Sequence, residues 1–464
     1  MIINSVKDGG KTIIVLGTDH ISFALGELLR EYGNEVSLYC PNSDPSLIYR
    51  GDSEFAMEIV RDINSYHLDS IDLIILGQNL SLDDHGLGSN IAKKISQLAD
   101  KVFLAAAIIK DLFPENKFVA IFGKSYRKII CSALSYIFGD RQTNVIGPAT
   151  LPTEDSYSDG KSISNLNLRE NNIFVLDLAA LEMDYLKNLS FDVTALLNLE
   201  KEEQLHLVRN FLAKQNGNGV LMVNIDNPIF KDFQENFALT NNGGIRIMPI
   251  SVEKMVENGY SYVNGTIYNY HNSNLSYDLN NSNFVASNLN ELSLLSSFVI
   301  ASTLDLDSQI IMANLGTFRG LAHNMECLRH DKNIVFIDNS CADTVKLIES
   351  PFEMYSNIFA IFVVDSRTGG DLIRLKNHRD NIKLSFLIDV LGIVDDPSES
   401  CGNNVKIEKI DNVRDALAKI IDYVTENGIE DEIVVLLSPM FIDKMNNVYY
   451  SSYGDEFKKL VEGL

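Results

Sequence analysis

Val119–Lys128 reads VAIFGKSYRK, an apolar run that ends at a glycine and is followed by polar and basic residues. The pattern predicts a buried strand that passes into a helix. Amides at a helix N-terminus attract anions, so α/β proteins often bind phosphate at such a turn. The stretch is not a complete G-x-x-x-x-G-K-[ST] motif, because Phe118 stands five residues before Gly123. Local evidence leaves two interpretations, a phosphate-binding turn or a plain strand-to-helix turn with basic surface residues.

The residues before this stretch have the pattern of a parallel α/β sheet. Lys11–Gly17 is an apolar run that ends at a glycine, and the apolar residues of Phe23–Leu29 are spaced as one face of a helix. Further apolar runs predict strands at Val36–Tyr39, Asp72–Leu76 and Lys101–Leu104. Strands separated by helices need crossover connections, so we expect a parallel sheet.

A second α/β block begins after Phe113–Asn116, where Pro114 disfavours helix before it. Asn264-Gly265 lies in the middle of the alternating stretch Tyr260–Tyr270, which predicts a β-hairpin. His271–Asn290 is rich in Asn and Ser and is expected to be a surface loop before a helix at Glu291–Leu304. Apolar runs predict three more strands in this block, at Ile173–Leu178, Val193–Leu197 and Gly219–Asn224.

A third block begins near Asp305, and Val413–Thr425 in it has a helical pattern. Its expected strands are Ile334–Ile337, Ile358–Val364, Val405–Ile410 and Glu432–Leu437. A length of 464 residues also suggests three domains, at about 150 residues each. We therefore predict an α/β protein with domains at residues 1–114, 115–306 and 307–464.

The composition excludes several classes of function. The formal charge of −24 argues against nucleic acid and anionic membrane surfaces as partners, because both are bound through clustered Lys and Arg. No run of 18 apolar residues is present, so no membrane-spanning helix is expected. The five cysteines form no CxxC pair, which argues against a disulfide scaffold and a cysteine zinc site. With no secretory signal pattern at the N-terminus, we expect the protein in the reducing cytoplasm. We also expect it to be a monomer.

Several motifs resemble the Mur ligase family, and their order and spacing agree over nearly the whole chain. Val435–Pro439 (VLLSP), followed by Tyr453–Phe457 (YGDEF), resembles the family's L-S-P and R-G-D-x-F. Phe318–Glu326 (FRGLAHNME) is similar to F-x-G-L-P-H-R-x-E, and Phe336–Asp343 (FIDNSCAD) to F-I-N-D-S-K-A-T. Phe174–Ala180 (FVLDLAA) resembles V-x-E-L-S-S.

The resemblance implies a three-domain architecture. Its N-terminal domain would be Rossmann-like, its central domain a P-loop-type ATPase and its C-terminal domain Rossmann-like. The nearest branch of the family adds D-glutamate to UDP-N-acetylmuramoyl-L-alanine in peptidoglycan biosynthesis. Its members phosphorylate a carboxylate with ATP and let the amine attack. The implied cofactors are therefore ATP and Mg²⁺, and the implied partners are a UDP-linked muramoyl peptide precursor and D-glutamate.

The resemblance also assigns site residues, each by its match to a family motif. Those implied to be catalytic are Asp177, Lys214 and His323. Those implied to bind metal are Asp177 and Glu203. Those implied to bind the nucleotide are Gly123, Arg127, Lys128, Asn290, Asn324 and Asn339. Those implied to bind the substrates are Gly17, Asp19, Arg367, Ser438, Asp443 and Tyr450.

The chain departs from the family pattern in the phosphate loop. An alignment without gaps puts Tyr126 on the second loop glycine, Arg127 on the lysine and Lys128 on the Mg²⁺-binding hydroxyl. A three-residue deletion would instead place Gly123-Lys124-Ser125 on the family's G-K-S. Two hypotheses follow, an active ligase with unusual residues or a Mur-fold protein that has lost ligation and serves as a binding or scaffolding module. A dinucleotide-dependent oxidoreductase is disfavoured, because no G-x-G-x-x-G follows the first strand.

Overall fold

The computed structural model describes residues 6–17, 20–39, 57–63, 67–77, 93–95, 97–123, 126–139, 143–146, 173–178, 190–199, 219–230, 245–270, 275–278, 291–331, 333–342, 345–364, 378, 380–390, 407–439 and 447–464. The chain forms two compact units. The first consists of Met1–Asn281 and Asn290–Leu315, and the second of Ser282–Leu289 and Gly316–Leu464. The first unit contains two sheets and the second unit contains one.

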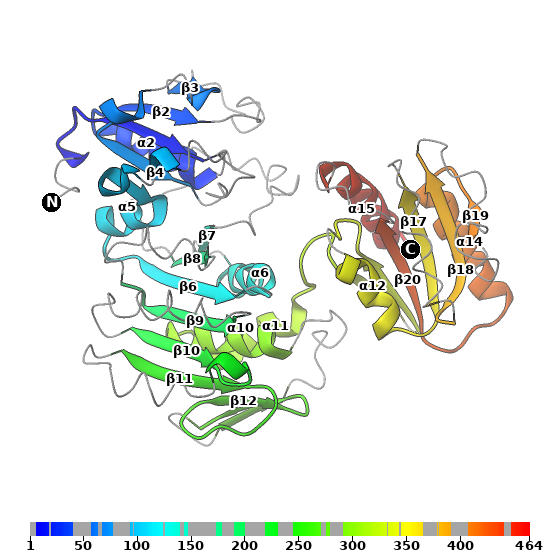
Figure 1. The fold of residues 1–464 in the computed structure, drawn as a ribbon. Coiled ribbons are helices and arrows are strands. Elements are labelled where there is room, and N and C mark those ends of the chain that lie inside the picture. The colour runs from blue at the N-terminus through cyan, green and yellow to red at the C-terminus, as the bar shows by residue number, and fades with distance from the viewer. Residues whose placement is uncertain are drawn as a thin grey trace. The chain divides into compact units, whose positions relative to one another are not determined.

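The first sheet is parallel and has the strand order β3-β2-β1-β4-β5. This order is that of the mononucleotide-binding half of a Rossmann fold. Its strands are β1 (Thr12–Leu16), β2 (Glu35–Tyr39), β3 (Glu58–Val60), β4 (Leu73–Leu76) and β5 (Val102–Leu104) (Figure 1). Its helices are α2 (His20–Glu31) and α5 (Ala105–Leu112), with short 3₁₀ turns at Leu68–Ser70 and Ala99–Lys101.

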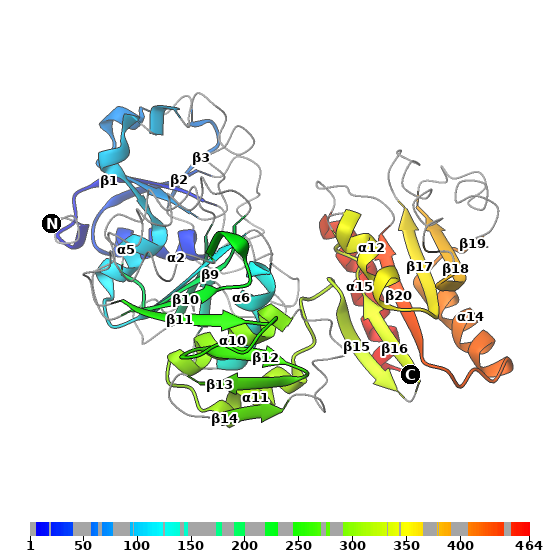
Figure 2. The same ribbon diagram turned by 60° about the horizontal axis from the view of Figure 1, so that its bottom comes forward.

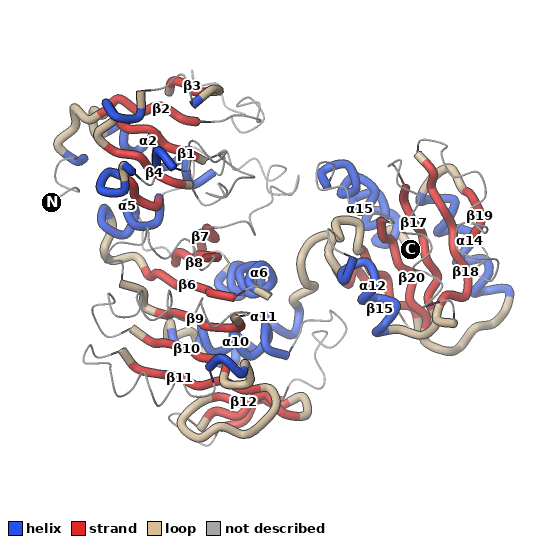
Figure 3. Tube along the Cα trace, viewed as in Figure 1, coloured by secondary structure: helices blue, strands red, loops and turns tan. Residues whose placement is uncertain are grey.

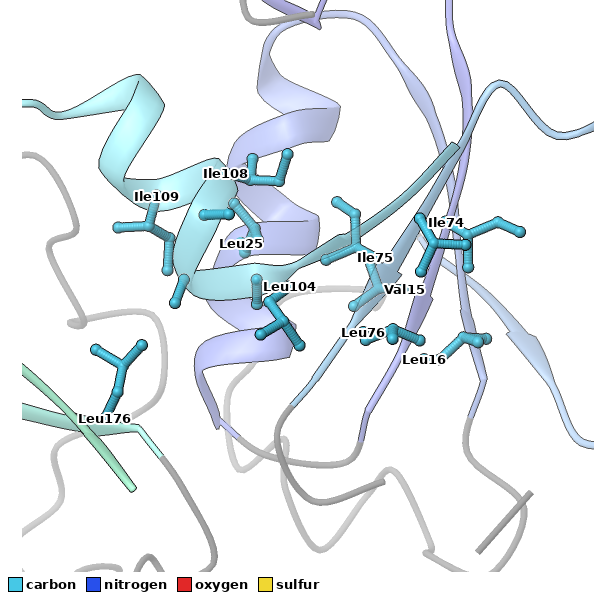
Figure 4. Close-up of a cluster of buried hydrophobic side chains, with 14 of the residues drawn as sticks. Val15, Leu16, Leu25, Ile74, Ile75, Leu76, Leu104, Ile108, Ile109 and Leu176 are labelled. Atoms are coloured by element: carbon cyan, nitrogen blue, oxygen red, sulfur yellow. The ribbon is translucent and has the colours of Figure 1, made fainter. Parts of the chain in front are cut away.

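The core of this sheet is aliphatic. Figure 4 shows Leu25 of α2 beside Ile108 of α5, with Ile75 and Leu104 of the sheet close to them. All four side chains are at most 3% exposed. Burying a side chain of this size stabilises the fold by about 1.5–3 kcal/mol, so the contact fixes both helices on the sheet.

The second sheet has the order β14-β13-β12-β11-β10-β9-β6-β8-β7. Pairing is parallel from β7 through to β12 and antiparallel in the hairpin beyond. The strands are β6 (Lys117–Gly123), β7 (Thr143–Ile146), β8 (Ile173–Leu178), β9 (Val193–Asn198), β10 (Val220–Asn224), β11 (Arg246–Ser251), β12 (Tyr260–Val263), β13 (Thr266–Asn269) and β14 (Leu275–Asp278). Its helices are α6 (Arg127–Phe138), α10 (Glu291–Thr303) and α11 (Ser308–Thr317), with a 3₁₀ turn at Pro228–Phe230.

The predicted hairpin is confirmed, and one neighbouring prediction is wrong in part. β12 and β13 pair antiparallel around Asn264-Gly265, which has positive φ at both residues. Within His271–Asn290, which we expected to be loop, Leu275–Asp278 forms the edge strand β14 against β13. This strand has mostly exposed side chains, so backbone pairing forms it and no apolar alternation marks it in the sequence.

The third sheet forms the core of the second unit, in the order β15-β16-β20-β17-β18-β19 (Figure 2). Only β15 runs antiparallel to its neighbour. The strands are β15 (Glu326–Asp331), β16 (Ile334–Asp338), β17 (Ile358–Val364), β18 (Ile382–Asp389), β19 (Ile407–Lys409) and β20 (Ile433–Pro439). α12 (Val345–Met354) packs on one face, while α14 (Val413–Glu426) and α15 (Asn447–Glu462) pack together on the other.

The predicted α/β class, with three mainly parallel sheets, is confirmed (Figure 3). The domain boundaries at residues 114 and 306 stay a prediction. In the part of the chain that the structure describes, no helix is long and apolar enough to cross a membrane.

Candidate functional site

The turn between β6 and α6 lies at the carboxyl edge of the second sheet. β6 pairs with β8 on one side and β9 on the other, so the turn leaves from the interior of the sheet. Gly123, the last residue of β6, lies close to β9, because an added Cβ would be 2.6 Å from Asn198 Oδ1. A side chain at Gly123 would therefore push the two strand ends apart. In parallel α/β sheets, ligands bind at this edge.

The N-terminus of α6 carries basic residues and no side-chain cap. Its N-cap residue, Tyr126, makes no capping hydrogen bond. Arg127 and Lys128 occupy the first turn, where the helix dipole disfavours cations. The helix dipole and these two adjacent cations together favour an anion at this end of the helix.

Tyr126 has the backbone conformation of a glycine. Its φ of 70° and ψ of −9° lie in the left-handed region, which costs an L-residue about 1–2 kcal/mol. The alignment without gaps puts the second loop glycine of the Mur ligases at this position. The chain thus has an aromatic residue, 37% exposed, in a left-handed conformation where that family has a glycine.

Two further predicted residues of the first unit lie at strand ends. Asp177 of β8 is the Cα partner of Ile121 in β6, two residues before Gly123. Its backbone therefore lies at the same edge of the sheet as the β6–α6 turn. Gly17, directly after β1, is buried, and an added Cβ would lie 2.9 Å from the Cα of Gly77 and inside contact distance of Ser22 Oγ. A glycine is required there for α2 to pack against the strand ends.

The second unit holds a buried ionic cluster at one end of its sheet. His323 lies in the loop before β15, Glu326 begins β15 and Asp338 ends β16. All three residues are at most 5% exposed. Asp455 and Lys458 of α15 complete the cluster, so two strands, a loop and a helix meet there.

His323 is held between two carboxylates. Its Nδ1 lies 2.7 Å from Asp338 Oδ2 and its Nε2 lies 3.5 Å from Asp455 Oδ1. Burial lowers the pKa of His323, but the hydrogen bond and charge of Asp338 together with the charges of Asp455 and Glu326 outweigh it, and the pKa is raised. The imidazolium therefore neutralises part of a strongly acidic cluster.

The loop around His323 is strained and tied down by hydrogen bonds. His323 and Met325 have φ of 61° and 53°, which costs about 1–3 kcal/mol for each such residue. The His323 amide donates to Glu326 Oε2 at 3.1 Å, and the Met325 amide donates to Asn339 Oδ1 at 3.1 Å. The Cys341 amide donates to the His323 carbonyl at 2.7 Å. These bonds hold Asn324, which lies between the two strained residues, at a fixed place.

Predicted residues of the second unit come together here. Asn339 directly follows β16, and its Nδ2 donates to Ser438 Oγ of β20 at 3.4 Å. Both residues are fully buried. Gly454 of α15 packs over the cluster, because an added Cβ would lie 2.5 Å from Asp338 Oδ2. Ser340 Oγ, beside it, is buried without a hydrogen-bond partner among the described residues.

His323, Glu326 and Asp338 have the donor types of a metal site, with their ligand atoms within 4.8 Å of one another. Their oxygens already accept hydrogen bonds: Glu326 from the His323 amide and Lys458, Asp338 from His323 and the Ser340 amide. A metal would have to displace these bonds and the imidazolium. The cluster is an internal ion lock, and its hydrogen bonds hold the loop that contains His323 in place. The catalytic role of His323 stays a prediction.

The remaining predicted site residues lie outside the described residues and stay predictions: Asp19, Glu203, Lys214, Asn290, Arg367 and Asp443. Of Asp177 and Tyr450, only the backbone is described. The sequence interpretation missed Asp338, Glu326 and Asp455 as site residues. For Asp338 a signal was present, since a carboxylate at the carboxyl end of a parallel strand commonly faces a cleft.

Comparisons with known proteins agree with this fold. No family model matches the chain. Over 98% of its length the chain is 22% identical to the UDP-N-acetylmuramoylalanine–D-glutamate ligase of Paramagnetospirillum magneticum, of which 96% is covered. It is 19% identical to the ligase of the same name from Clostridioides difficile, covering 98% of the chain and 99% of that protein.

Two solved structures share the architecture. UDP-N-acetylmuramate–alanine ligase MurC from Thermotoga maritima superposes with a TM-score of 0.53 at 15% identity, covering 97% of this chain and 99% of MurC. MurF from Acinetobacter baumannii gives 0.51 at 12% identity, covering 95% and 93%. At these identities the structures establish the fold alone.

Proposed function

We propose that this chain, which has the Mur ligase fold and resembles that family along its whole length, is an ATP-dependent ligase that joins D-glutamate to a UDP-linked muramoyl peptide precursor. The resemblance predicted from the sequence motifs is confirmed, both for the family and for its D-glutamate-adding ligases of peptidoglycan biosynthesis. The substrates, the cofactors and the activity are the proposal.

The observation that carries the proposal is the backbone of the β6–α6 turn. Tyr126 keeps a left-handed conformation that a tyrosine adopts only at a cost, and it does so where a phosphate loop has its glycine. The turn leads into a helix N-terminus with Arg127 and Lys128 in its first turn. ATP bound there would supply the phosphoryl group that activates the carboxylate. Arg127 and Lys128 would hold the phosphates and balance their charge.

The described residues at this turn fit a triphosphate better than they fit Mg²⁺. Lys128 presents an ammonium group where the family has a metal-binding hydroxyl, and like charges repel. Magnesium needs hard oxygen ligands. Asp177, at the neighbouring strand end, is the carboxylate that we propose for this role.

The second unit would present the amino-acid substrate. The ion lock around His323 fixes the loop that carries Asn324, and the bond between Asn339 and Ser438 fixes the adjoining strand ends. A rigid frame of this kind lets neighbouring side chains hold a substrate in one orientation, which lowers the entropic cost of reaction. We propose Arg367 for the acidic side chain of D-glutamate, since a guanidinium pairs well with a carboxylate.

Phosphate release tests this function. The full chain with ATP and Mg²⁺ is expected to release phosphate only when UDP-N-acetylmuramoyl-L-alanine and D-glutamate are both present. Arg127→Ala should lower the rate by about 10²-fold, because it removes a charge placed at the phosphates. Arg414→Ala, on the exposed surface of α14, is the matched control and should leave the rate unchanged. No release, or release without D-glutamate, contradicts the proposal.

A second candidate is a Mur-fold binding module without ligation. It is favoured by the Tyr126 ring, which would crowd a bound phosphate, and by the Lys128 ammonium, which would repel a bound metal ion. This module should be stabilised against heat by UDP-N-acetylmuramoyl-L-alanine but not by Mg-ATP. An active ligase should be stabilised by both, since a ligand that binds only the folded state raises Tm.

A further inference from the structure

A charged cavity lies at the amino edge of the second sheet, within the first unit. Its volume is about 390 Å³. Lys117 at the start of β6, Asp192 before β9 and Arg246 at the start of β11 line it. Lys110 of α5 and Asp305, just after α10, also line it. Helices and strands from both sheets of the unit therefore contribute to one hollow.

This cavity is separate from the proposed nucleotide site. β6 runs from Lys117 at the cavity to Gly123 at the β6–α6 turn. A strand rises about 3.3 Å per residue, so the two sites are roughly 20 Å apart at opposite ends of the strand. One ligand the size of a small metabolite cannot occupy both.

Two lysines and one carboxylate form the first group of charges in the cavity. Asp192 Oδ1 lies 3.0 Å from Lys117 Nζ, and Asp192 Oδ2 lies 3.7 Å from Lys110 Nζ. The Phe118 amide also donates to Asp192 Oδ2, at 2.9 Å. One carboxylate thus pairs with two ammonium groups and accepts a hydrogen bond from an amide. These three side chains together therefore carry excess positive charge.

Lys110 is the more buried of the two lysines. Its side chain is 17% exposed, and its Nζ donates to the Asn116 carbonyl and lies over the Phe118 ring. Burial lowers the pKa of Lys110 and the nearby Lys117 lowers it further, while Asp192 only partly opposes them. Asp192 therefore balances only part of the cost of keeping the Lys110 ammonium group charged, and an anion in the cavity would stabilise that charge.

Arg246 adds a third cation. It is exposed, and the structure gives it no ion pair within the described residues. Its guanidinium has five N–H donors in a planar fork that matches a carboxylate or a phosphate. With Lys110 and Lys117 set against Asp192 and Asp305, the lining has a net charge of 3 − 2 = +1. That excess stands out in a chain whose net charge is −24.

Buried residues and backbone form part of the wall of the cavity. The Phe191 ring, 5% exposed, and the buried Val220 supply apolar surface. Gly219 forms part of the wall, and an added Cβ there would clash with the Phe191 carbonyl oxygen. Apolar walls with a few converging polar groups are typical of small-ligand sites.

We propose that this cavity binds a small oxyanion, a phosphate or carboxylate group, between Arg246 and the Lys110–Lys117 pair. The anion is held by charge-assisted hydrogen bonds. It would bind where α5, the last helix of the first sheet, is tied to the second sheet through the ion pair of Lys110 with Asp192. The bound anion would therefore contact residues at the junction between the two sheets. The proposal does not depend on the function proposed above.

Calorimetric titration of the full chain with inorganic phosphate, at constant ionic strength, tests the proposal. Arg246→Gln and Lys117→Gln each remove one exposed cation and should weaken phosphate binding about tenfold, which corresponds to about 1.4 kcal/mol. Lys254→Gln, an exposed lysine outside the cavity, is the matched control and should bind as the unmodified chain does. Arg127→Ala separates this site from the N-terminus of α6 and should also leave the cavity affinity unchanged. Acetate and a phosphate monoester, titrated in the same way, show which oxyanion the cavity prefers.

The outcomes are exclusive. Weakening in both cavity variants, with the two other variants unaffected, supports the site. Equal affinity in Arg246→Gln and the unmodified chain overturns it. So does the absence of phosphate binding, or its loss in Arg127→Ala alone. Circular dichroism of each variant must match the unmodified chain, which is expected because Lys117 and Arg246 are exposed.

Discussion

Tyr126 offers the sharpest test of the β6–α6 turn, through the pair of substitutions Tyr126→Gly and Tyr126→Ala. Both remove the ring, but only glycine is free of the left-handed strain at φ 70°. Alanine keeps that strain, about 1–2 kcal/mol, while glycine loses about 0.5–1 kcal/mol of chain entropy. The Gly variant should therefore be more stable than the Ala variant by about 0.5–1 kcal/mol.

Tyr136 is the matched control, because it is an exposed tyrosine inside the same helix. There, glycine should be less stable than alanine by about 1 kcal/mol, the ordinary helix preference. The sign of the Gly–Ala difference should thus reverse between the two positions. The chain has no Trp, so urea unfolding is best followed by far-UV circular dichroism, comparing midpoints at unchanged slope.

The same variants test the nucleotide site. Removal of the Tyr126 ring should raise the thermal shift given by ATP, because phosphate can then approach the backbone more closely. If glycine is no more stable than alanine at position 126, the backbone there is not left-handed, and the likeness to a phosphate loop is refuted.

Three further predictions concern the second unit. The pKa of His323 is raised above its ordinary 6.5. The stability that its protonation adds is therefore fully present below pH 6.5 and is lost as the pH rises through the pKa of the folded state. In measurements of unfolding free energy against pH, His323→Gln should abolish this loss. Gly454→Ala should destabilise the unit by about 1–3 kcal/mol, since its methyl would press on Asp338. Gly463→Ala, with no contact closer than 3.5 Å, should change the urea midpoint little. Phe362→Ala in the central strand β17 should cost about 3–5 kcal/mol and lower the Tm most; an unchanged Tm would mean that this core is not close-packed.

Local patterns were sufficient where burial is continuous. Two such strands are Thr12–Leu16 and Ile358–Val364, which are apolar runs in parallel strands covered on both faces. Each was predicted within one residue of its observed bounds. The helix Val413–Glu426 was equally clear, because its buried residues recur at helical spacing.

Elements that form through pairing gave no such signal. Glu326–Asp331 is an antiparallel edge strand of mixed polarity, and Leu275–Asp278 is an exposed edge strand. Their backbones become strands because a neighbouring strand offers hydrogen-bond partners. A periodicity in side-chain polarity cannot report that condition.

The candidate site divides in the same way. By resemblance, the sequence alone named Gly123, Arg127, His323, Asn339 and Ser438, because each stands in a short motif with a recognisable chemical role. It did not reveal that Tyr126 takes a left-handed backbone.

Which charged side chains meet depends on how the elements pack in three dimensions. Asp338 and Asp455 both contact the His323 ring because β16 and α15 converge at one end of the sheet. Lys110 pairs with Asp192 because α5 packs beside the second sheet. The buried strands, the amphipathic helices and the family resemblance could be predicted from the sequence, since those follow from the order of neighbouring residues. Contacts between distant residues follow from strand order and helix packing, which exist only once the apolar faces have been buried together.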